Sequence, residues 1–153
     1  MSTPRQNWMN CVFRTSCFPR LWLVVFLLIL QTKILLGNDP AVVPKFELDI
    51  QPIFTASGCN AGGCHGKSRG QNGFALSLLG FDDDFDYSAV VHESRGRRVF
   101  PADPSFSLLL QKAAGEVPHG GGVRLPVDSL AYETVKAWIA GGMPRTSAAD
   151  PVF

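Results

Sequence analysis

A short segment with two cysteines and a histidine constrains this chain more than any other feature. It reads Cys59-Asn60-Ala61-Gly62-Gly63-Cys64-His65-Gly66. In such a pattern each thiol can add to a vinyl group of haem, and the histidine after the second cysteine can ligate the iron; the common spacing is C-x-x-C-H. Here four residues separate the cysteines, and Gly62 and Gly63 predict a loop that bulges at little steric cost. The segment therefore predicts one covalent haem c per chain, bound by Cys59 and Cys64, with His65 as an iron ligand.

Other interpretations of the cysteine pair stay open: a disulfide, a zinc or other metal site, or two free thiols. A structural zinc site usually has four ligands from Cys, His or acidic side chains, and Cys59 and Cys64 are the only cysteines after residue 37. A plain disulfide between Cys59 and Cys64 is the simpler alternative. An exported chain with one close cysteine pair directly followed by histidine is better explained by haem than by a disulfide framework.

The first 37 residues have the pattern of a secretory signal peptide. Three arginines, Arg5, Arg14 and Arg20, precede an apolar run over residues 21–30, and no acidic residue lies among them. A membrane-spanning helix needs about 20 apolar residues, so this run predicts an export signal, cleaved after Gly37. The alternative is an uncleaved anchor over residues 21–36. We expect an exported protein, periplasmic or at the cell surface, associated with the membrane only if the segment is retained.

Removal of residues 1–37 changes the charge of the chain. Four of the 14 basic residues but none of the 13 acidic ones lie in the leader, so the remainder has 10 basic and 13 acidic residues, a net charge of −3. A mildly acidic domain without a basic stripe argues against nucleic-acid binding. The length of the remainder predicts one domain over residues 38–145, and residues 146–153, which have no apolar periodicity, predict a linker or tail that could lead to further domains.

The domain itself is predicted to be all-α with long irregular loops. The apolar pattern becomes helical at Phe46, but Pro52 within it predicts a helix that begins only near Asp49 and ends before Gly58. Further helices are predicted near residues 82–91, 104–115 and 129–140, and a short strand, an extended arm or a helical turn is predicted over residues 74–78. In the last helix, Asp128 or Ser129 is the expected cap. Its predicted buried stripe consists of Leu130, Thr134, Val135, Trp138 and Ile139.

Two further features have both a structural and a functional interpretation. Arg95, Arg97 and Arg98 could hold a haem propionate by charge-assisted hydrogen bonds, but such a cluster is more often a solvated loop. Trp138 could pack on the edge of a porphyrin, whereas a tryptophan in a helix stripe is more often simply core.

Six segments in a fixed order resemble the cytochrome c superfamily, and in particular the cytochrome c-like domains at the N-termini of large secreted planctomycete proteins. The similarity covers about residues 45–145, nearly the whole expected domain. The segments are DIQPIF (49–54), CNAGGCHG (59–66), GFALSL (73–78), PSFSLL (104–109), VPHGGG (117–122) and WIAGG (138–142). The resemblance implies an all-α fold around haem c, with the first and last helices crossing.

The resemblance also bears on the sixth iron ligand. Many members of the broader superfamily carry Met-Pro-Pro before the last helix, where Met ligates the iron; here Val117-Pro118-His119 stands in that place. The distal ligand of the family lies on the loop before the final helix, so His119 is the predicted sixth ligand. Met143, which follows that helix, and His92 are the alternatives, as is an iron with no protein ligand on that side.

The resulting functional prediction is an exported electron carrier rather than a catalyst. Its redox partner is unknown, and in longer relatives further domains follow the haem domain. A non-redox interaction or targeting module of a larger secreted protein is one alternative. A haem sensor or peroxidase with an open iron site is the other.

Overall fold

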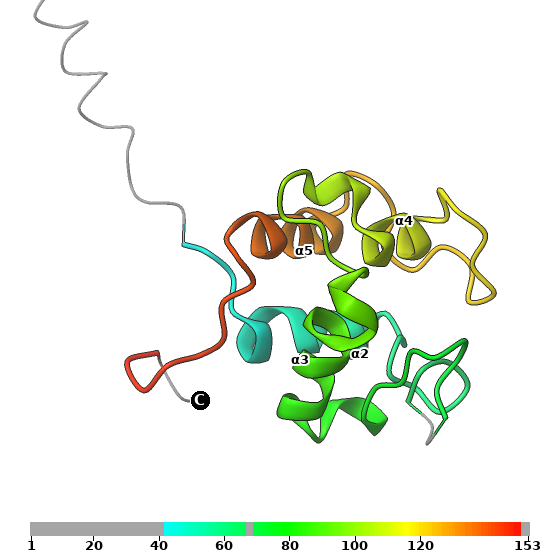
Figure 1. The fold of residues 1–153 in the computed structure, drawn as a ribbon, viewed down its shortest axis with the longest axis horizontal. Coiled ribbons are helices and arrows are strands. Elements are labelled where there is room, and N and C mark those ends of the chain that lie inside the picture. Colours follow the sequence, from blue (N-terminus) through cyan, green and yellow to red (C-terminus); the bar gives the residue numbers. More distant parts are fainter. Residues whose placement is uncertain (1–41, 67–68, 151–153) are drawn as a thin grey trace, which may run out of the picture. The chain divides into compact units, whose positions relative to one another are not determined.

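The structure is a computed structural model that describes residues 42–66 and 69–150. All of these residues belong to one compact unit. Within them the chain is helical, with a single isolated bridge between Gln71 and Phe74 and no sheet. Figure 1 shows α2 and α3 on one side of this unit and α4 and α5 on the other. The all-α prediction is confirmed for this part of the chain.

The first helical segment begins earlier than the sequence predicted. A π-helical turn, η1 (Phe46–Ile50), leads directly into α2 (Gln51–Ala56). Proline lacks an N–H and is tolerated only in the first turn of an α-helix, so Pro52 fixes the start of α2 rather than of the whole segment. Ahead of it, the Asp49 carboxylate accepts a hydrogen bond from the Lys45 backbone N–H at 2.7 Å. This contact satisfies one of the free donors at the helix start.

An arm over residues 73–77 leads to the short 3-10 helix η2 (Leu78–Gly80), and α3 (Asp83–Val91) follows. Asp82 caps α3 by accepting a hydrogen bond from the Phe85 N–H at 2.9 Å. Asp86 instead points inward and is 1 % exposed. Its carboxylate accepts hydrogen bonds from the Ser77 N–H (2.5 Å), the Ser77 hydroxyl (2.8 Å) and the Gln51 amide (3.2 Å). Asp86 therefore fastens the arm to α3.

The predicted helix over residues 104–115 is two helices. After the turn η3 (Glu93–Gly96), the 3-10 helix η4 (Pro104–Phe106) ends at Ser107, and α4 (Leu108–Ala114) begins after it. Ser107 has an extended backbone and is fully buried, and its hydroxyl accepts a hydrogen bond from the Phe100 N–H at 3.0 Å. This tertiary contact separates the two helices. Gly115, in the left-handed conformation (φ 79°), ends α4.

The last helix, α5 (Leu130–Ala140), is capped by Ser129, whose hydroxyl accepts a hydrogen bond from the Tyr132 N–H at 3.2 Å. Its buried side chains are Tyr132, Val135, Trp138 and Ile139. The predicted stripe was wrong at Leu130, which is 85 % exposed, and at Thr134, which is only half-buried, and it missed Tyr132. The buried face runs at intervals of three and four from Tyr132, so Leu130 falls beside it at the solvent-exposed first turn.

The first and last helical segments meet in the core. Trp138 on α5 is fully buried, with its ring centroid 5.6 Å from that of Phe46 on η1, and Tyr87 on α3 packs edge-on against both. The Trp138 indole N–H donates a hydrogen bond to the Pro144 carbonyl at 3.0 Å. Trp138 is therefore a core residue, as the structural interpretation predicted.

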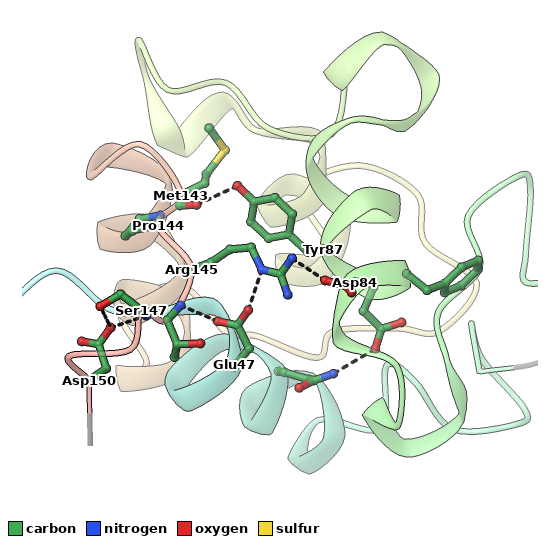
Figure 2. A network of polar contacts seen from close by, with 12 residues as sticks. Glu47, Asp84, Tyr87, Met143, Pro144, Arg145, Ser147 and Asp150 are labelled. Atoms are coloured by element: carbon green, nitrogen blue, oxygen red, sulfur yellow. Dashed lines mark hydrogen bonds and ion pairs between the residues drawn. The ribbon is translucent and has the colours of Figure 1, made fainter. Parts of the chain in front are cut away.

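The segment after α5 folds back against η1 and α3. Arg145 donates hydrogen bonds to the carboxylates of Glu47 and Asp84, at 2.6 Å each, and its guanidinium lies over the Tyr87 ring, as Figure 2 shows. The Thr146 N–H donates a hydrogen bond to the other Glu47 oxygen at 2.7 Å. These bonds lower the pKa of Glu47 against the opposing effect of its partial burial. Ordered contacts continue beyond Thr146, because the Asp150 carboxylate accepts hydrogen bonds from Ser147 and lies 3.8 Å from Lys45 Nζ.

Across the described residues, no helix has both the length and the apolar character needed to cross a membrane. The predicted signal peptide, its cleavage position and the alternative anchor over residues 21–36 lie outside the described residues.

Candidate functional site

The cysteine segment forms a closed loop after α2. The His65 N–H donates a hydrogen bond to the Cys59 carbonyl at 2.9 Å, and the Cys64 N–H donates one to the Ala61 carbonyl at 2.9 Å. Gly66 closes this loop so tightly that a Cβ there would lie 1.8 Å from the Asn60 carbonyl oxygen. The backbone thus brings the two cysteines and His65 to one place.

The glycine prediction for this loop needs correction. Gly62 and Gly63 do not adopt positive φ; the left-handed glycine is Gly58 (φ 72°), where the chain turns out of α2, and the sterically required one is Gly66. The tight points are therefore the two ends of the loop rather than its middle. One buried polar side-chain atom in the described residues has no hydrogen-bond partner, Asn60 Oδ1, and it belongs to the same loop.

Cys59 and Cys64 are both free thiols and both partly buried. Burial raises the pKa of the Cys59 thiol to about 11, against the opposing charge of Arg124; the nearby Cys64 raises it further. The Cys59 thiol is therefore favoured in its protonated form at neutral pH.

His65 is half-buried and held by the arm that follows the loop. Its Nδ1 lies 2.9 Å from the Phe74 carbonyl oxygen, and its ring centroid is 4.6 Å from that of Phe74. Burial lowers the pKa of His65, the hydrogen bond to Phe74 opposes this shift, and the nearby charges of His119 and Arg98 reinforce it. Neutral imidazole is therefore favoured, which is the form that binds a metal.

His119 is half-buried on the loop between α4 and α5. Its Nδ1 lies 2.9 Å from the Gly122 carbonyl oxygen, and the Gly122 N–H donates back to the His119 carbonyl at 3.0 Å. Lys112 on α4 donates a hydrogen bond to the Pro118 carbonyl at 2.7 Å. Hydrogen bonds therefore hold the chain both before His119, at Pro118, and after it, at Gly122.

The two histidines, 54 positions apart in the sequence, come together in the structure. The His65 and His119 rings are parallel to within 6°, and their centroids are 6.3 Å apart. In both, Nδ1 is engaged by a backbone carbonyl. If Nδ1 carries the proton, as such a carbonyl requires, each ring keeps the lone pair on Nε2.

Arg124 connects this pair of loops. It donates hydrogen bonds from Nε to the Gly121 carbonyl at 2.8 Å and from Nη1 to the Ser57 carbonyl at 3.4 Å, and Nη2 lies 3.9 Å from Cys64 Sγ. The His119 loop is therefore fastened against the cysteine loop by one side chain.

The other two candidate ligands lie elsewhere. Met143, with φ 58°, packs against the core after α5, and its carbonyl accepts a hydrogen bond from the Tyr87 hydroxyl at 2.9 Å (Figure 2). His92 is exposed at the end of α3, edge-on to the Tyr87 ring. Both are neighbours of Tyr87, whereas His119 is the neighbour of His65.

The three arginines do not act as a group. Arg95 and Arg97 are exposed, but Arg98 is only 4 % exposed and donates hydrogen bonds to the carbonyls of Ala89 and Gly73. For Arg98, neither the propionate interpretation nor the solvated-loop interpretation matches these contacts. Its partners are parts of the protein backbone.

An open apolar hollow of about 300 Å³ lies beside the cysteine loop. It is bordered by Gly66, by the arm and by the start of α3, and its apolar rim includes Leu78, Phe81 and Phe85. Neither histidine lines it, so it is distinct from the space between the two rings. Among the described residues, no three or more His, Cys, Asp or Glu side chains are grouped so that they could hold a metal ion.

Sequence reasoning missed the supporting residues of this site. The Phe74 and Gly122 contacts are made by backbone carbonyls, which carry no side-chain signal. Arg124 lies five residues after His119, but only the fold brings it to Cys64.

We compared the chain with family models, with curated proteins and with solved structures, and found no match in any of the three.

Proposed function

We propose that this chain is an exported, cytochrome c-like electron-transfer domain. In this proposal Cys59 and Cys64 would attach one haem c covalently, and His65 and His119 would ligate its iron. The observation that carries the proposal is the parallel pair of imidazoles next to two free cysteines.

The separation of the two rings fits a single metal ion between them. A metal–imidazole bond is about 2.0 Å long, and with bonds of about 1.35 Å each atom of a five-membered ring lies about 1.1 Å from its centre. If the Nε2 atoms of two imidazoles faced one ion from opposite sides, the ring centroids would be about 6.2 Å apart. The His65 and His119 centroids are 6.3 Å apart, and their planes are parallel to within 6°. A ring of four further ligands would complete the coordination that two histidines cannot supply alone. Haem iron brings such a ring with it.

The hydrogen bonds of the two rings support the same assignment. Ligating histidines usually donate their other ring N–H to a carbonyl or carboxylate, which fixes the tautomer and the ring orientation. Phe74 and Gly122 supply these carbonyls for His65 and His119. The burial that keeps His65 neutral acts in the same direction, because only neutral imidazole ligates.

Two features of the fold agree with what the resemblance to the cytochrome c superfamily implied. That resemblance implied contact between the first and last helices, and η1 and α5 pack together through Phe46 and Trp138. The sequence order of cysteine loop, arm, middle helix and histidine loop is that of the six resembling segments.

When bound, haem c supplies a one-electron couple at iron, whose potential depends on the axial ligands, on burial and on nearby hydrogen bonds. The protein residues hold the two imidazoles in place through the carbonyls of Phe74 and Gly122. A peroxidase or sensor needs one open face at the iron, and His119 at its observed position would close that face. We therefore favour electron transfer over those two activities.

Location and partners complete the proposal. The signal-peptide pattern of residues 1–37 supports export to the periplasm or the cell surface, with membrane attachment only if that segment is retained. A net charge of −3 after the leader gives no reason to expect nucleic acid.

The deciding experiment is expression of the full chain in a host with a c-type haem maturation system, followed by acid-acetone extraction. We expect haem that resists extraction, and its loss in the Cys59→Ser/Cys64→Ser variant. A wild-type protein that exports and folds without any haem would refute the proposal in favour of an interaction module.

The ligand assignment is tested on the same preparation. We expect a low-spin ferric spectrum that becomes high-spin in His119→Ala and stays low-spin in the matched control Met143→Ala. The reverse pattern would transfer the sixth position to Met143, and a high-spin wild-type spectrum would favour a sensor or peroxidase.

A further inference from the structure

One buried cation in the described residues, the Arg98 guanidinium, lies between α3 and the arm that holds His65. Its side chain is 5 % exposed, and its one acidic neighbour is Glu93, with Nη1 and Oε2 3.7 Å apart. A buried guanidinium is costly unless its donors are satisfied. The partners that satisfy it therefore indicate what the residue does.

Those partners belong to two separate elements. Nη1 donates a hydrogen bond to the Ala89 carbonyl at 2.6 Å, and Nη2 donates one to the Gly73 carbonyl at 2.6 Å. Ala89 lies in the last turn of α3, where carbonyls have no partner within the helix. Arg98 thus caps α3 with one nitrogen and binds the arm with the other.

The same side chain also contacts the residue that holds the proximal histidine. The Arg98 guanidinium lies 4.6 Å from the centre of the Phe74 ring, and the Phe74 carbonyl is the partner of His65 Nδ1. The Phe74 ring in turn packs on the His65 imidazole at 4.6 Å. A continuous set of contacts therefore runs from α3 through Arg98 and Phe74 to His65.

We propose that Arg98 is a positioning residue for His65, which fixes the Phe74 carbonyl and ring and thereby sets the orientation and the Nδ1–H hydrogen bond of the proximal imidazole. The inference rests on the proposed function, because it treats His65 as an axial ligand. It assigns Arg98 no contact with haem.

The geometry requires arginine rather than lysine. Two nitrogens of the planar guanidinium bind carbonyls on two different elements, and the face of the guanidinium lies over the Phe74 ring. The ammonium group of lysine cannot bind both carbonyls in this way and has no planar face to stack on the ring. A lysine at position 98 keeps the charge but loses one carbonyl and the ring contact. A carbonyl that accepts the Nδ1–H of a ligating histidine raises the basicity of that imidazole. If Arg98 no longer fixed the Phe74 carbonyl, this hydrogen bond would weaken, the iron–imidazole bond would weaken with it, and the potential of the iron would rise.

The experiment compares the haem-loaded full chain with Arg98→Lys and with the matched control Arg97→Lys, which changes an exposed neighbour. Reduced low-spin haem is diamagnetic, so the His65 Nδ1–H proton can be followed by NMR as it exchanges with D₂O. We expect exchange at least tenfold faster in Arg98→Lys, with a higher midpoint potential and an unchanged low-spin spectrum. Arg97→Lys should match the wild type in all three.

Equal exchange rates and potentials in Arg98→Lys and the wild type would overturn the positioning role and leave the haem proposal intact. A wild-type protein without covalent haem would overturn both. If Arg98→Lys does not fold, the wild type provides the test: the Arg98 Nη protons should give separate, protected resonances. Averaged, rapidly exchanging Nη protons would show that the guanidinium is not fixed to the arm and would refute the inference.

Discussion

Replacement of Asp86 by alanine should cost the domain about 3–5 kcal/mol of unfolding free energy. The carboxylate is 1 % exposed and is the acceptor for three donors, the Ser77 N–H, the Ser77 hydroxyl and the Gln51 amide. The Gln51 amide keeps a second acceptor in the Gly80 carbonyl at 3.0 Å, but the two Ser77 donors lose their acceptor. Each buried donor left unpaired costs about 1–3 kcal/mol, and the space left by the carboxylate adds to this sum.

The loss would be a large part of the total, since domains of this size have about 5–15 kcal/mol of stability. Urea unfolding, followed by far-UV circular dichroism, measures it as a lower midpoint at unchanged slope. Asp83→Ala is the matched control, because Asp83 is exposed on the first turn of the same helix, α3, where an acid contributes at most about 1 kcal/mol. If Asp86→Ala loses no more stability than Asp83→Ala, the carboxylate does not fasten the arm to α3.

Two further predictions concern the haem-free protein. Burial raises the pKa of Cys59 to about 11 from 9.0, so the folded protein at pH 8 has about 100-fold less Cys59 thiolate than the unfolded chain. Iodoacetamide followed by mass spectrometry should label Cys59 correspondingly slowly, and equal rates with and without urea would contradict this. Burial also lowers the pKa of His65 below 6.5, so below pH 6.5 the unfolded state takes up a proton that the folded state refuses. Unfolding free energy should therefore fall as the pH drops from 6.5 through the lowered pKa; His65→Gln should remove this dependence, and the same slope in that variant would assign it to other groups.

Local features of the fold were predictable from the sequence because the residues that cause them are neighbours in the chain. The caps Asp82 and Ser129 and the terminator Gly115 act within one turn of their helices. The break at Ser107 was not predictable, since it depends on a hydrogen bond from the Phe100 N–H. Sequence pattern alone favours a continuous helix there.

In the candidate site, too, some residues were predictable from the sequence and others were not. The side chains that could bind haem were visible in the sequence, because their chemistry depends on residue type and spacing. Their supports were not, because Phe74 and Gly122 act through backbone carbonyls and Arg98 through partners 9 and 25 positions away. Arg98 also shows why charge alone misleads: two of three clustered arginines are exposed, and the third is in the interior.

The hydrogen bonds of Glu47 with Arg145 and Thr146 hold the two ends of this domain together. The Phe46 N–H donates a hydrogen bond to the Pro144 carbonyl at 3.1 Å, and both Arg145 and Thr146 bind Glu47. The chain therefore enters the domain and leaves it at the same point. Domains whose two ends are adjacent tolerate insertion and fusion well. A segment joined at either end can therefore be exchanged or lengthened without disturbing the packing of the core. Attachment at one place leaves the rest of the domain surface accessible.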